Sequence, residues 1–464
     1  MTKKIGKIKK PKYLNIDGQI TKTGLNILIN DESFPIEYPK EIWQKYSQNL
    51  KEILLDNLAY SSTIFLPQIL NLSEINYRTA RPLSESFLFK NGIYDMPTCA
   101  IADNQSSLGY VKNFFNTQYF FPSNKIKTPK LINLSSSTNK KKTAIIPFSF
   151  GKESMLSLSL CQEIGIRPIL VNFIEPSDDF EYFHKKKLIA KFEKEMKIKV
   201  YVVKYGPGIL RYGKYWGMAT DLGWGLQTTE YALLSLPFFD YFAADYIILG
   251  NEQSCNDVFF DKEGILTYKA AYDQHRDWTS QQGLLASMTL GRKVKVSSFM
   301  EPLYEIAITK ILHNRYPEYG KYQMSCMADN DKARYNRWCQ DCIKCGYIYA
   351  LCCAVKCDLN KVSFTENLFD KKHYHIYDHL FNYDPQAPAY GSQEELGLAF
   401  YLAYRNGYRG YSIAKFKAKL LKKFENNKNK YLKKYLGINS INNIPEELRK
   451  PILNIYREEL KQWI

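Results

Sequence analysis

The sequence lacks the features that mark membrane and secreted proteins. No apolar window approaches the roughly 18 charge-free residues that a membrane-spanning helix needs. The nearest candidate, LLSLPFFDYFAADYIILG, is interrupted by Asp240 and Asp245. The basic N-terminal stretch is not followed by an apolar segment, so it is unlike a secretory signal. We therefore expect a cytoplasmic protein that does not act at a membrane.

A stripe of Arg and aromatic residues, which would indicate RNA binding, is also missing. The net charge of +17 comes from 64 Lys and Arg against 47 Asp and Glu. Much of the Lys excess falls in segments expected to be solvated: the first dozen residues, Lys140–Lys142, and the stretch KFKAKLLKKFENNKNKYLKK from Lys415. We favour a solvated surface and a small-molecule substrate over a nucleic-acid partner. Nucleic-acid binding stays open as an alternative. A homodimer is also possible.

The length of 464 residues and the hydrophobic fraction of 45% predict two or three domains with a sizeable core. A polar stretch, Phe121–Lys142, indicates a linker. We predict an N-terminal α+β domain at 1–135, an α/β domain at 140–358 and a helical C-terminal region at 359–464. Short apolar strands that alternate with helices in the α/β domain predict a parallel five-stranded sheet with flanking helices. The expected strands are Ile145–Phe148, Pro168–Ile174, Lys199–Tyr205, Asp245–Gly250 and Lys293–Phe299.

A short turn, Ser149–Ser154, follows the first strand of the α/β domain and leads into a helix-like pattern. It is neither GxxxxGK[ST] nor GxGxxG. Gly151 permits a tight turn whose amides can bind an anion, two serines add hydroxyl groups, and Lys152 can neutralise phosphate charge. The alternative is an ordinary strand-to-helix turn with a serine cap.

The second signal is a group of cysteines in a C-x2-C-x2-C pattern with one more upstream. The four, Cys326, Cys339, Cys342 and Cys345, are expected to hold a structural zinc ion in tetrahedral geometry. A disulfide, free thiols and an iron–sulfur cluster are the alternatives. The cysteines farther along, at 352, 353 and 357, lie in an apolar helix and are expected to be core thiols. His184 and His313 lie in helix-like segments, where histidines are more often structural, and neither is assigned a role.

The turn SFGKES resembles the SGGxDS motif of the PP-loop ATP pyrophosphatases, which are adenine nucleotide α-hydrolase-like (HUP) proteins. Phe150 stands where that motif has its first glycine, and Glu153 replaces its aspartate. Turn, α/β unit and cysteine group, in that order, resemble 7-cyano-7-deazaguanine synthases and the PP-loop epimerases that act on UDP-muramoyl-dipeptides. The resemblance covers Thr143 to Ala354. It implies that ATP is bound by Ser149, Phe150, Gly151, Lys152, Glu153 and Ser154, with Mg²⁺ beside the phosphates.

Further site residues are expected on loops of the α/β domain. Gly250 and Asn251 lie at the end of the fourth strand, and the resemblance implies that they contact the nucleotide. Lys152, Glu153 and Glu252 are expected to be catalytic. Two polar, aromatic loops are expected to contact the substrate through Trp224, Asp273, His275 and Arg276.

The resemblance implies an enzyme that converts ATP to AMP and pyrophosphate while it adenylates a carboxylate or amide oxygen of a small molecule. Ammonia attack on the adenylate would make the enzyme ligase-like, whereas loss of an α-proton would make it an epimerase. A tRNA-modifying enzyme of the same superfamily is one alternative. A non-catalytic nucleotide-binding component of a multiprotein defence system is another.

Overall fold

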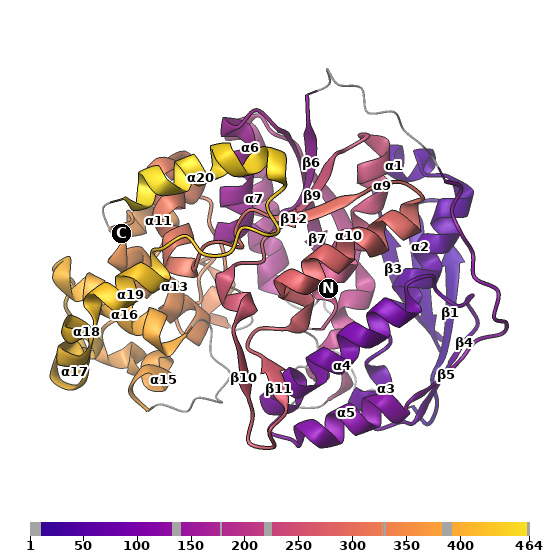
Figure 1. Ribbon diagram of the computed structural model, residues 1–464, viewed down its shortest axis with the longest axis horizontal. Coiled ribbons are helices and arrows are strands. Elements are labelled where there is room, and N and C mark those ends of the chain that lie inside the picture. Colours follow the sequence, from indigo (N-terminus) through magenta and orange to yellow (C-terminus); the bar gives the residue numbers. More distant parts are fainter. Residues whose placement is uncertain are drawn as a thin grey trace.

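The computed structural model describes residues 11–131, 141–176, 179–217, 225–326, 328, 331–382 and 392–461. Its main feature is a ten-stranded sheet in the order β12-β9-β6-β7-β8-β3-β2-β1-β4-β5 (Figure 1). The strands of this sheet are β1 (Asn15–Ile20), β2 (Gly24–Ile29), β3 (Glu32–Glu37), β4 (Glu74–Tyr77), β5 (Gln118–Phe120), β6 (Thr143–Pro147), β7 (Arg167–Ile174), β8 (Val200–Tyr205), β9 (Tyr246–Leu249) and β12 (Lys295–Ser298). A separate hairpin joins β10 (Val258–Phe260) to β11 (Leu266–Tyr268).

Five neighbouring strands of the sheet, β12, β9, β6, β7 and β8, run parallel to one another. Each of the five strands predicted from the sequence overlaps one of them. The prediction of a five-stranded parallel sheet is nevertheless wrong, because the sheet continues beyond β8. β3 pairs antiparallel with β8 through Ile36–Tyr205 and Glu37–Lys204, and brings β2, β1, β4 and β5 into the same mixed sheet. This pairing gives hydrogen-bond partners to backbone groups at the edge of β8, which would otherwise be unpaired.

Helices cover both faces of the sheet, and alternate residues of a strand belong to different cores. In β6, Ala144 and Ile146 belong to one core, whereas Ile145 belongs to the other. This two-residue period explains why the strand reads as a continuous apolar run: both faces of a parallel strand are buried.

The N-terminal helices and those of the middle of the chain form the core on one face. They are α1 (Lys40–Lys45), α2 (Gln48–Ser61), α3 (Leu66–Leu70), α4 (Glu85–Ala102), α5 (Ser107–Asn116), α8 (Gln227–Leu234), α9 (Leu236–Tyr241) and α10 (Arg276–Leu290). Most of them lie on the right in Figure 1.

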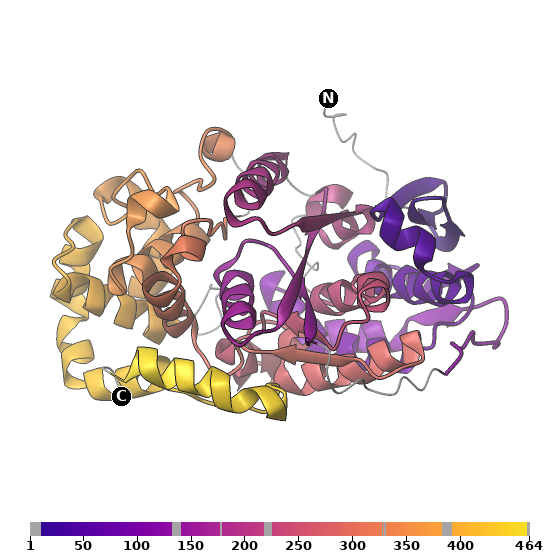
Figure 2. The same ribbon diagram turned by 90° about the horizontal axis from the view of Figure 1, so that it is seen from above.

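The core on the other face contains α6, α7 and the C-terminal helices (Figures 1 and 2). Its helices are α6 (Lys152–Glu163), α7 (Asp179–Met196), α11 (Glu305–Arg315), α12 (Pro317–Gly320), α13 (Ile343–Ala354), α14 (Leu359–Val362), α15 (Asp378–Phe381), α16 (Gln393–Arg405), α17 (Tyr411–Lys419), α18 (Leu421–Asn426), α19 (Lys428–Tyr435) and α20 (Glu446–Leu460). Short 3₁₀ helices are η1 (Gly206–Arg211), η2 (Gly213–Trp216), η4 (Gln253–Asn256), η5 (Tyr272–Gln274), η6 (Asp331–Arg334) and η7 (Lys371–Tyr377). The C-terminal region is thus helical, as expected, while the predicted domain boundaries stay a prediction.

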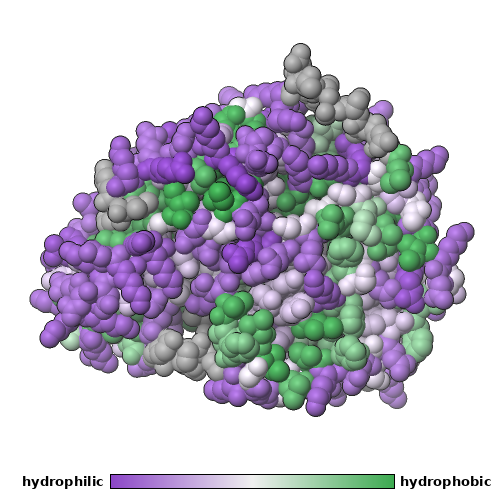
Figure 3. All heavy atoms as spheres, viewed as in Figure 1, coloured by the Kyte–Doolittle hydropathy of each residue, from purple (hydrophilic) through white to green (hydrophobic). Residues whose placement is uncertain are grey.

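Within the described ranges, no helix combines the length and apolar character that crossing a bilayer requires. The face shown in Figure 3 is mostly hydrophilic, and its apolar patches are separated from one another by polar side chains. This face therefore presents no single large hydrophobic surface.

Candidate functional site

The sheet has a topological switch point between β6 and β9. From β6 the chain runs to β7 and then β8 on one side, and it returns to β9 on the other side of β6. α6, which follows β6, packs into one core, and α10, which precedes β12, packs into the other. In open α/β sheets, ligands bind at the carboxyl ends of strands at such a point. The turn Ser149–Ser154 and the loop from Gly250 both lie there.

The turn has a phenylalanine at a position where its backbone favours glycine. Phe150 has a φ of 62°, in the left-handed region that favours glycine. Its ring is fully buried against Phe148 and Phe192, with ring centroids 4.6 Å and 5.8 Å away. Its carbonyl accepts a hydrogen bond of 2.8 Å from the Met324 amide. Phe150 therefore has a glycine-like backbone, and its side chain belongs to the core.

The start of α6 has no side-chain cap. Gly151 is the N-cap residue, and its own amide donates to Ser149 Oγ at 3.2 Å. Ser149 is exposed, whereas Ser154 is buried and donates from Oγ to the Gly151 carbonyl at 3.1 Å. An uncapped start of a twelve-residue helix, beside an exposed hydroxyl, is an arrangement that can accept an anion.

Lys152 does not face solvent beside the turn. Its side chain is only 4% exposed and forms ion pairs with Glu153 and with Glu305, the first residue of α11. Burial by itself would lower the pKa of Lys152, but the two carboxylates outweigh burial and raise the pKa above its ordinary value. Lys152 is therefore a permanently charged, fixed ammonium behind the turn.

Two further buried carboxylates complete a group that we call the Lys152 cluster: Lys152, Glu153, Glu252, Glu305 and Glu395. Glu252 caps η4 by accepting from the Ser254 amide at 2.8 Å, and Glu395 of α16 accepts from the Ile306 amide at 2.8 Å. Burial, with the nearby Glu305 charge, raises the pKa of Glu395 to about 8. Burial, followed by the charges of Glu305 and Glu395, raises the pKa of Glu252 well above its ordinary value. The Glu395 carboxyl is therefore mostly protonated at neutral pH, and the raised pKa of Glu252 favours its neutral form in the same way.

Sequence reasoning found Lys152, Glu153 and Glu252 but missed Glu305 and Glu395. No signal existed for Glu395, which comes from the C-terminal region that the sequence set apart.

Gly250 lies against the turn, and Asn251 follows it. A Cβ on Gly250 would stand 2.8 Å from the Glu153 Cβ, so only glycine permits this approach. Asn251 is buried and donates to Thr279 Oγ1 at 2.9 Å, while its carbonyl accepts from Ser298 Oγ at 2.5 Å. The side chain of Asn251 therefore ties the loop to α10.

Two of the predicted substrate residues, Asp273 and His275, make hydrogen bonds to backbone amides in the first turns of helices. Asp273 is fully buried and accepts from the Thr228 amide at 2.6 Å at the start of α8; burial raises its pKa despite its hydrogen bonds to Thr228 and Thr229. His275 caps α10 by accepting from the Asp277 amide at 3.2 Å, and burial lowers its pKa.

Arg276 is the most exposed of these residues, with 40% of its side chain accessible. Its backbone amide donates to Asn256 Oδ1 at 2.9 Å. Trp224, the fourth predicted substrate residue, lies outside the described residues.

A second buried ionic group lies at the carboxyl ends of β7 and β8 and was missed by sequence reasoning. Arg211 is 4% exposed and forms ion pairs with both Glu175 and Glu230. Burial, opposed by Arg211, raises the pKa of Glu230 to about 7. Burial would also raise the pKa of Glu175, but Arg211 and hydrogen bonds outweigh it and lower that pKa. No local motif announces this group, since its members are far apart in sequence.

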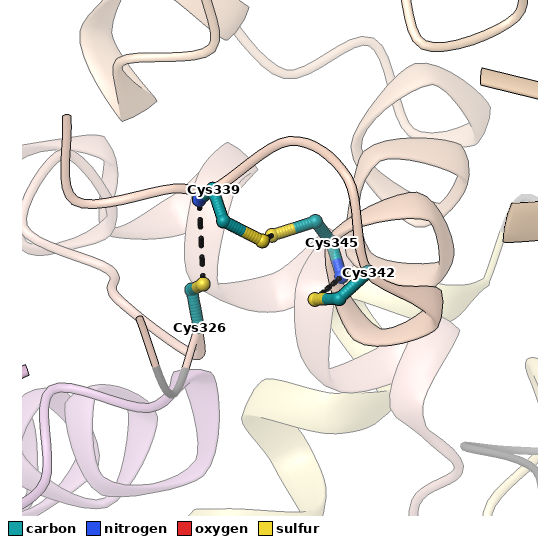
Figure 4. Close-up of side chains that lie close together, drawn as sticks. All are labelled: Cys326, Cys339, Cys342 and Cys345. Carbon is teal, nitrogen blue, oxygen red and sulfur yellow. Dashed lines mark hydrogen bonds between the residues drawn. The ribbon is translucent and has the colours of Figure 1, made fainter. Parts of the chain in front are cut away.

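The four predicted metal-ligating cysteines come together (Figure 4). Their Sγ atoms lie within 4.8 Å of one another, and Cys339 Sγ is 3.6 Å from Cys345 Sγ. Backbone amides donate to two of the sulfurs: Ala328 to Cys326 at 3.2 Å and Cys345 to Cys342 at 3.3 Å. Hydrogen bonds from the other thiols, Cys326 first, lower the pKa of Cys339.

This geometry is compatible with zinc. Four thiolates at about 2.3 Å from a tetrahedral zinc ion stand roughly 3.8 Å apart, close to the distance between Cys339 and Cys345 sulfurs. An iron–sulfur cluster has several metal atoms and its own sulfides, so it would hold its thiolates farther apart. The cysteine quartet thus fits one metal ion, which would use all four thiolates.

Two hollows in the described structure lie away from the switch point. One, of about 440 Å³, is bounded by α10, β12 and residues 442–449. The other, of about 210 Å³, lies between α3 and α5. At the switch point, Lys152 instead forms ion pairs with Glu153 and Glu305.

Comparison of the chain with protein-family models gave no match, and comparison with curated proteins gave none either.

Proposed function

We propose that the protein is a PP-loop-type ATP pyrophosphatase that adenylates a carboxylate or amide oxygen of a small molecule. The observation that supports this most is the meeting of two loops at the switch point: the turn Ser149–Ser154 after β6 and Gly250 after β9. The uncapped start of α6 offers backbone amides to phosphate oxygens, and Ser149 adds an exposed hydroxyl.

In the proposed reaction, the substrate oxygen attacks the α-phosphorus of ATP. The bond from that phosphorus to the oxygen that bridges it to the β-phosphorus breaks, and pyrophosphate leaves with that oxygen. The products are an acyl- or imidoyl-adenylate and pyrophosphate. The α6 amides would bind the departing pyrophosphate, and the fixed charge of Lys152 would act from behind the turn.

Glu153 lies within the turn, and its carboxylate would assist a Mg²⁺ ion that screens the phosphates. The cysteine quartet would hold a structural zinc ion, which stabilises the segment that ends at α13 and takes no part in the chemistry.

The test is to incubate the chain with ATP labelled at the α-phosphate, Mg²⁺ and a panel of acceptors. The panel includes a UDP-muramoyl peptide, a carboxy-deazaguanine and bulk tRNA. We expect AMP and pyrophosphate with one acceptor class. ADP as the product, or no thermal stabilisation by ATP with Mg²⁺, would contradict the proposal, and ATP binding without pyrophosphate release under every acceptor would indicate a non-catalytic nucleotide-binding protein.

A matched pair of serines assigns the activity to the turn. Ser149→Ala removes the exposed hydroxyl of the turn, whereas Ser159→Ala removes a buried hydroxyl that donates to the Met155 carbonyl at 2.9 Å within α6. We expect a loss of AMP formation of about tenfold or more with Ser149→Ala and little change with Ser159→Ala. Equal effects would argue against the turn as the phosphate site.

A further inference from the structure

A second group of soft ligands lies at the other end of α13 from the cysteine quartet. A ring nitrogen of His313 and the Sγ atoms of Cys352 and Cys357 lie within 4.8 Å of one another. Cys352 is fully buried and Cys357 is 7% exposed. After α13 ends, the Cys357 amide donates to the Cys352 carbonyl at 2.9 Å, which turns the chain back and brings the two cysteines together.

The neighbours of His313 prepare it for ligation. Its Nε2 lies 2.7 Å from Gln323 Oε1, an atom that can only accept, so Nε2 carries the proton and Nδ1 keeps its lone pair. A carbonyl-type oxygen on the distal nitrogen is the usual support of a metal-bound histidine. A Cβ on residue 320 would stand 2.7 Å from His313 Nδ1, so Gly320 keeps the space beside that nitrogen clear.

We propose that His313, Cys352 and Cys357 form a second metal site, which takes a thiophilic divalent ion of the zinc class. Two thiolates neutralise a divalent ion, and a neutral imidazole adds no charge, so the complex carries no net charge into the apolar core. No fourth His, Cys, Asp or Glu from the described ranges joins the group, which leaves one coordination position for water or an external ligand. This proposal does not rest on the proposed ATP chemistry.

Cys353 provides a matched control. It is fully buried and adjacent to Cys352 in α13, but it lies outside the His313 group, and its neighbours include the hydroxyls of Tyr349 and Tyr408. Replacing it removes a core thiol of the same size without removing a proposed ligand.

The first experiment counts zinc per full-length chain by elemental analysis after extensive dialysis. We expect two zinc ions in the unmodified chain and in Cys353→Ala, and one in Cys352→Ala and Cys357→Ala. One zinc ion in the unmodified chain would overturn the proposal. So would an unchanged count in Cys357→Ala, or a disulfide between Cys352 and Cys357 found by mass spectrometry.

A second experiment needs no variant of the site and so does not depend on whether such a variant folds. The full chain is produced with cobalt in place of zinc, and the thiolate-to-cobalt charge-transfer absorbance is measured per chain. Six ligating thiolates, against four for the quartet alone, predict an absorbance about 1.5-fold that of a four-thiolate cobalt site. Absorbance equal to that of four thiolates would overturn the proposal.

Discussion

The cysteine quartet and the Lys152 cluster are both buried, yet their groups are arranged in opposite ways. In the quartet, four donors of one kind converge, and the contacts around them come from backbone amides that favour thiolates. In the Lys152 cluster, a cation and carboxylates satisfy one another. Like donors that converge are suited to an external ion, whereas opposite charges that pair neutralise one another in part within the fold. The first arrangement thus indicates its ligand directly, and the second indicates only that charge is held at the switch point.

The largest expected effect is on the quartet. Cys339→Ala removes one of four thiolates, so we expect the bound metal to be lost together with a substantial part of the roughly 10–16 kcal/mol that binds a structural zinc ion. Elemental analysis and chemical unfolding measure the two losses. The matched control is Cys161→Ala, a fully buried cysteine in α6 outside both metal groups. If Cys339→Ala keeps its metal, the quartet is not a metal centre.

The next effect tests whether the Lys152 cluster is internally paired. Lys152→Met leaves buried carboxylates without their cation, and we expect a loss of about 3–5 kcal/mol in the free energy of unfolding. Combining Lys152→Met with Glu305→Gln should recover part of that loss, because one unpaired charge is removed. Lys191→Met, at a side chain that is 61% exposed, should change stability by less than about 0.5 kcal/mol. Strictly additive losses would show that Lys152 and Glu305 are not coupled.

A smaller effect tests the contact between the two loops of the switch point. Gly250→Ala places a Cβ 2.8 Å from the Glu153 Cβ, and we expect a loss of about 1–3 kcal/mol together with lower AMP formation. In Gly283→Ala the nearest atom is 3.4 Å away, and this helical glycine should instead tolerate or gain stability from alanine. Unfolding midpoints and product assays compare the pair. Equal stability of the two variants would contradict a close contact between the Gly250 loop and the turn.

The smallest effect is the pH dependence of the Lys152 cluster. The pKa of Glu395 is about 8 in the fold against an ordinary 4.5, so its stabilising contribution is fully present below pH 4.5 and is lost as pH rises through 8. Glu395→Gln keeps an oxygen for the Ile306 amide and stays uncharged. We expect it to be more stable than the unmodified chain by about 1–2 kcal/mol near pH 9 and similar near pH 5.

The control for this pH effect is the neighbouring Glu394→Gln. Glu394 pairs with Lys434, and its pKa is lowered, so its contribution is present above its ordinary pKa. Urea unfolding at both pH values should show no gain for Glu394→Gln near pH 9. A gain there, or none for Glu395→Gln, would contradict the assignment of the raised pKa.

The parts of the molecule that could be predicted are those whose structure is determined by residues close together in the sequence. Five parallel strands could be recognised from apolar runs because both faces of each strand are buried. The ligands Cys339, Cys342 and Cys345 lie within seven residues, so their convergence needs little more than one turn before α13. The extension of the sheet through β3 could not be predicted, since it depends on which edge strand stays unsatisfied after the parallel strands assemble.

The same division applies to the candidate site. The turn Ser149–Ser154 was visible as a local pattern, but the burial of Lys152 depends on Glu305 from α11, which is 153 residues away. Glu395 reaches the cluster from α16, in a region that the sequence separated from the site. The ionic group of Arg211, Glu175 and Glu230 likewise comes from three different segments.

The sequence by itself determined the parallel strands, the cysteine quartet and the place of the turn, because apolar periodicity and close ligand spacing act over a few residues. Only the tertiary structure decided that the N-terminal strands extend the same sheet, that Lys152 is buried between carboxylates, and that His313 meets Cys352 and Cys357. Those outcomes depend on desolvation and on unpaired edges, which exist only after distant segments have packed together.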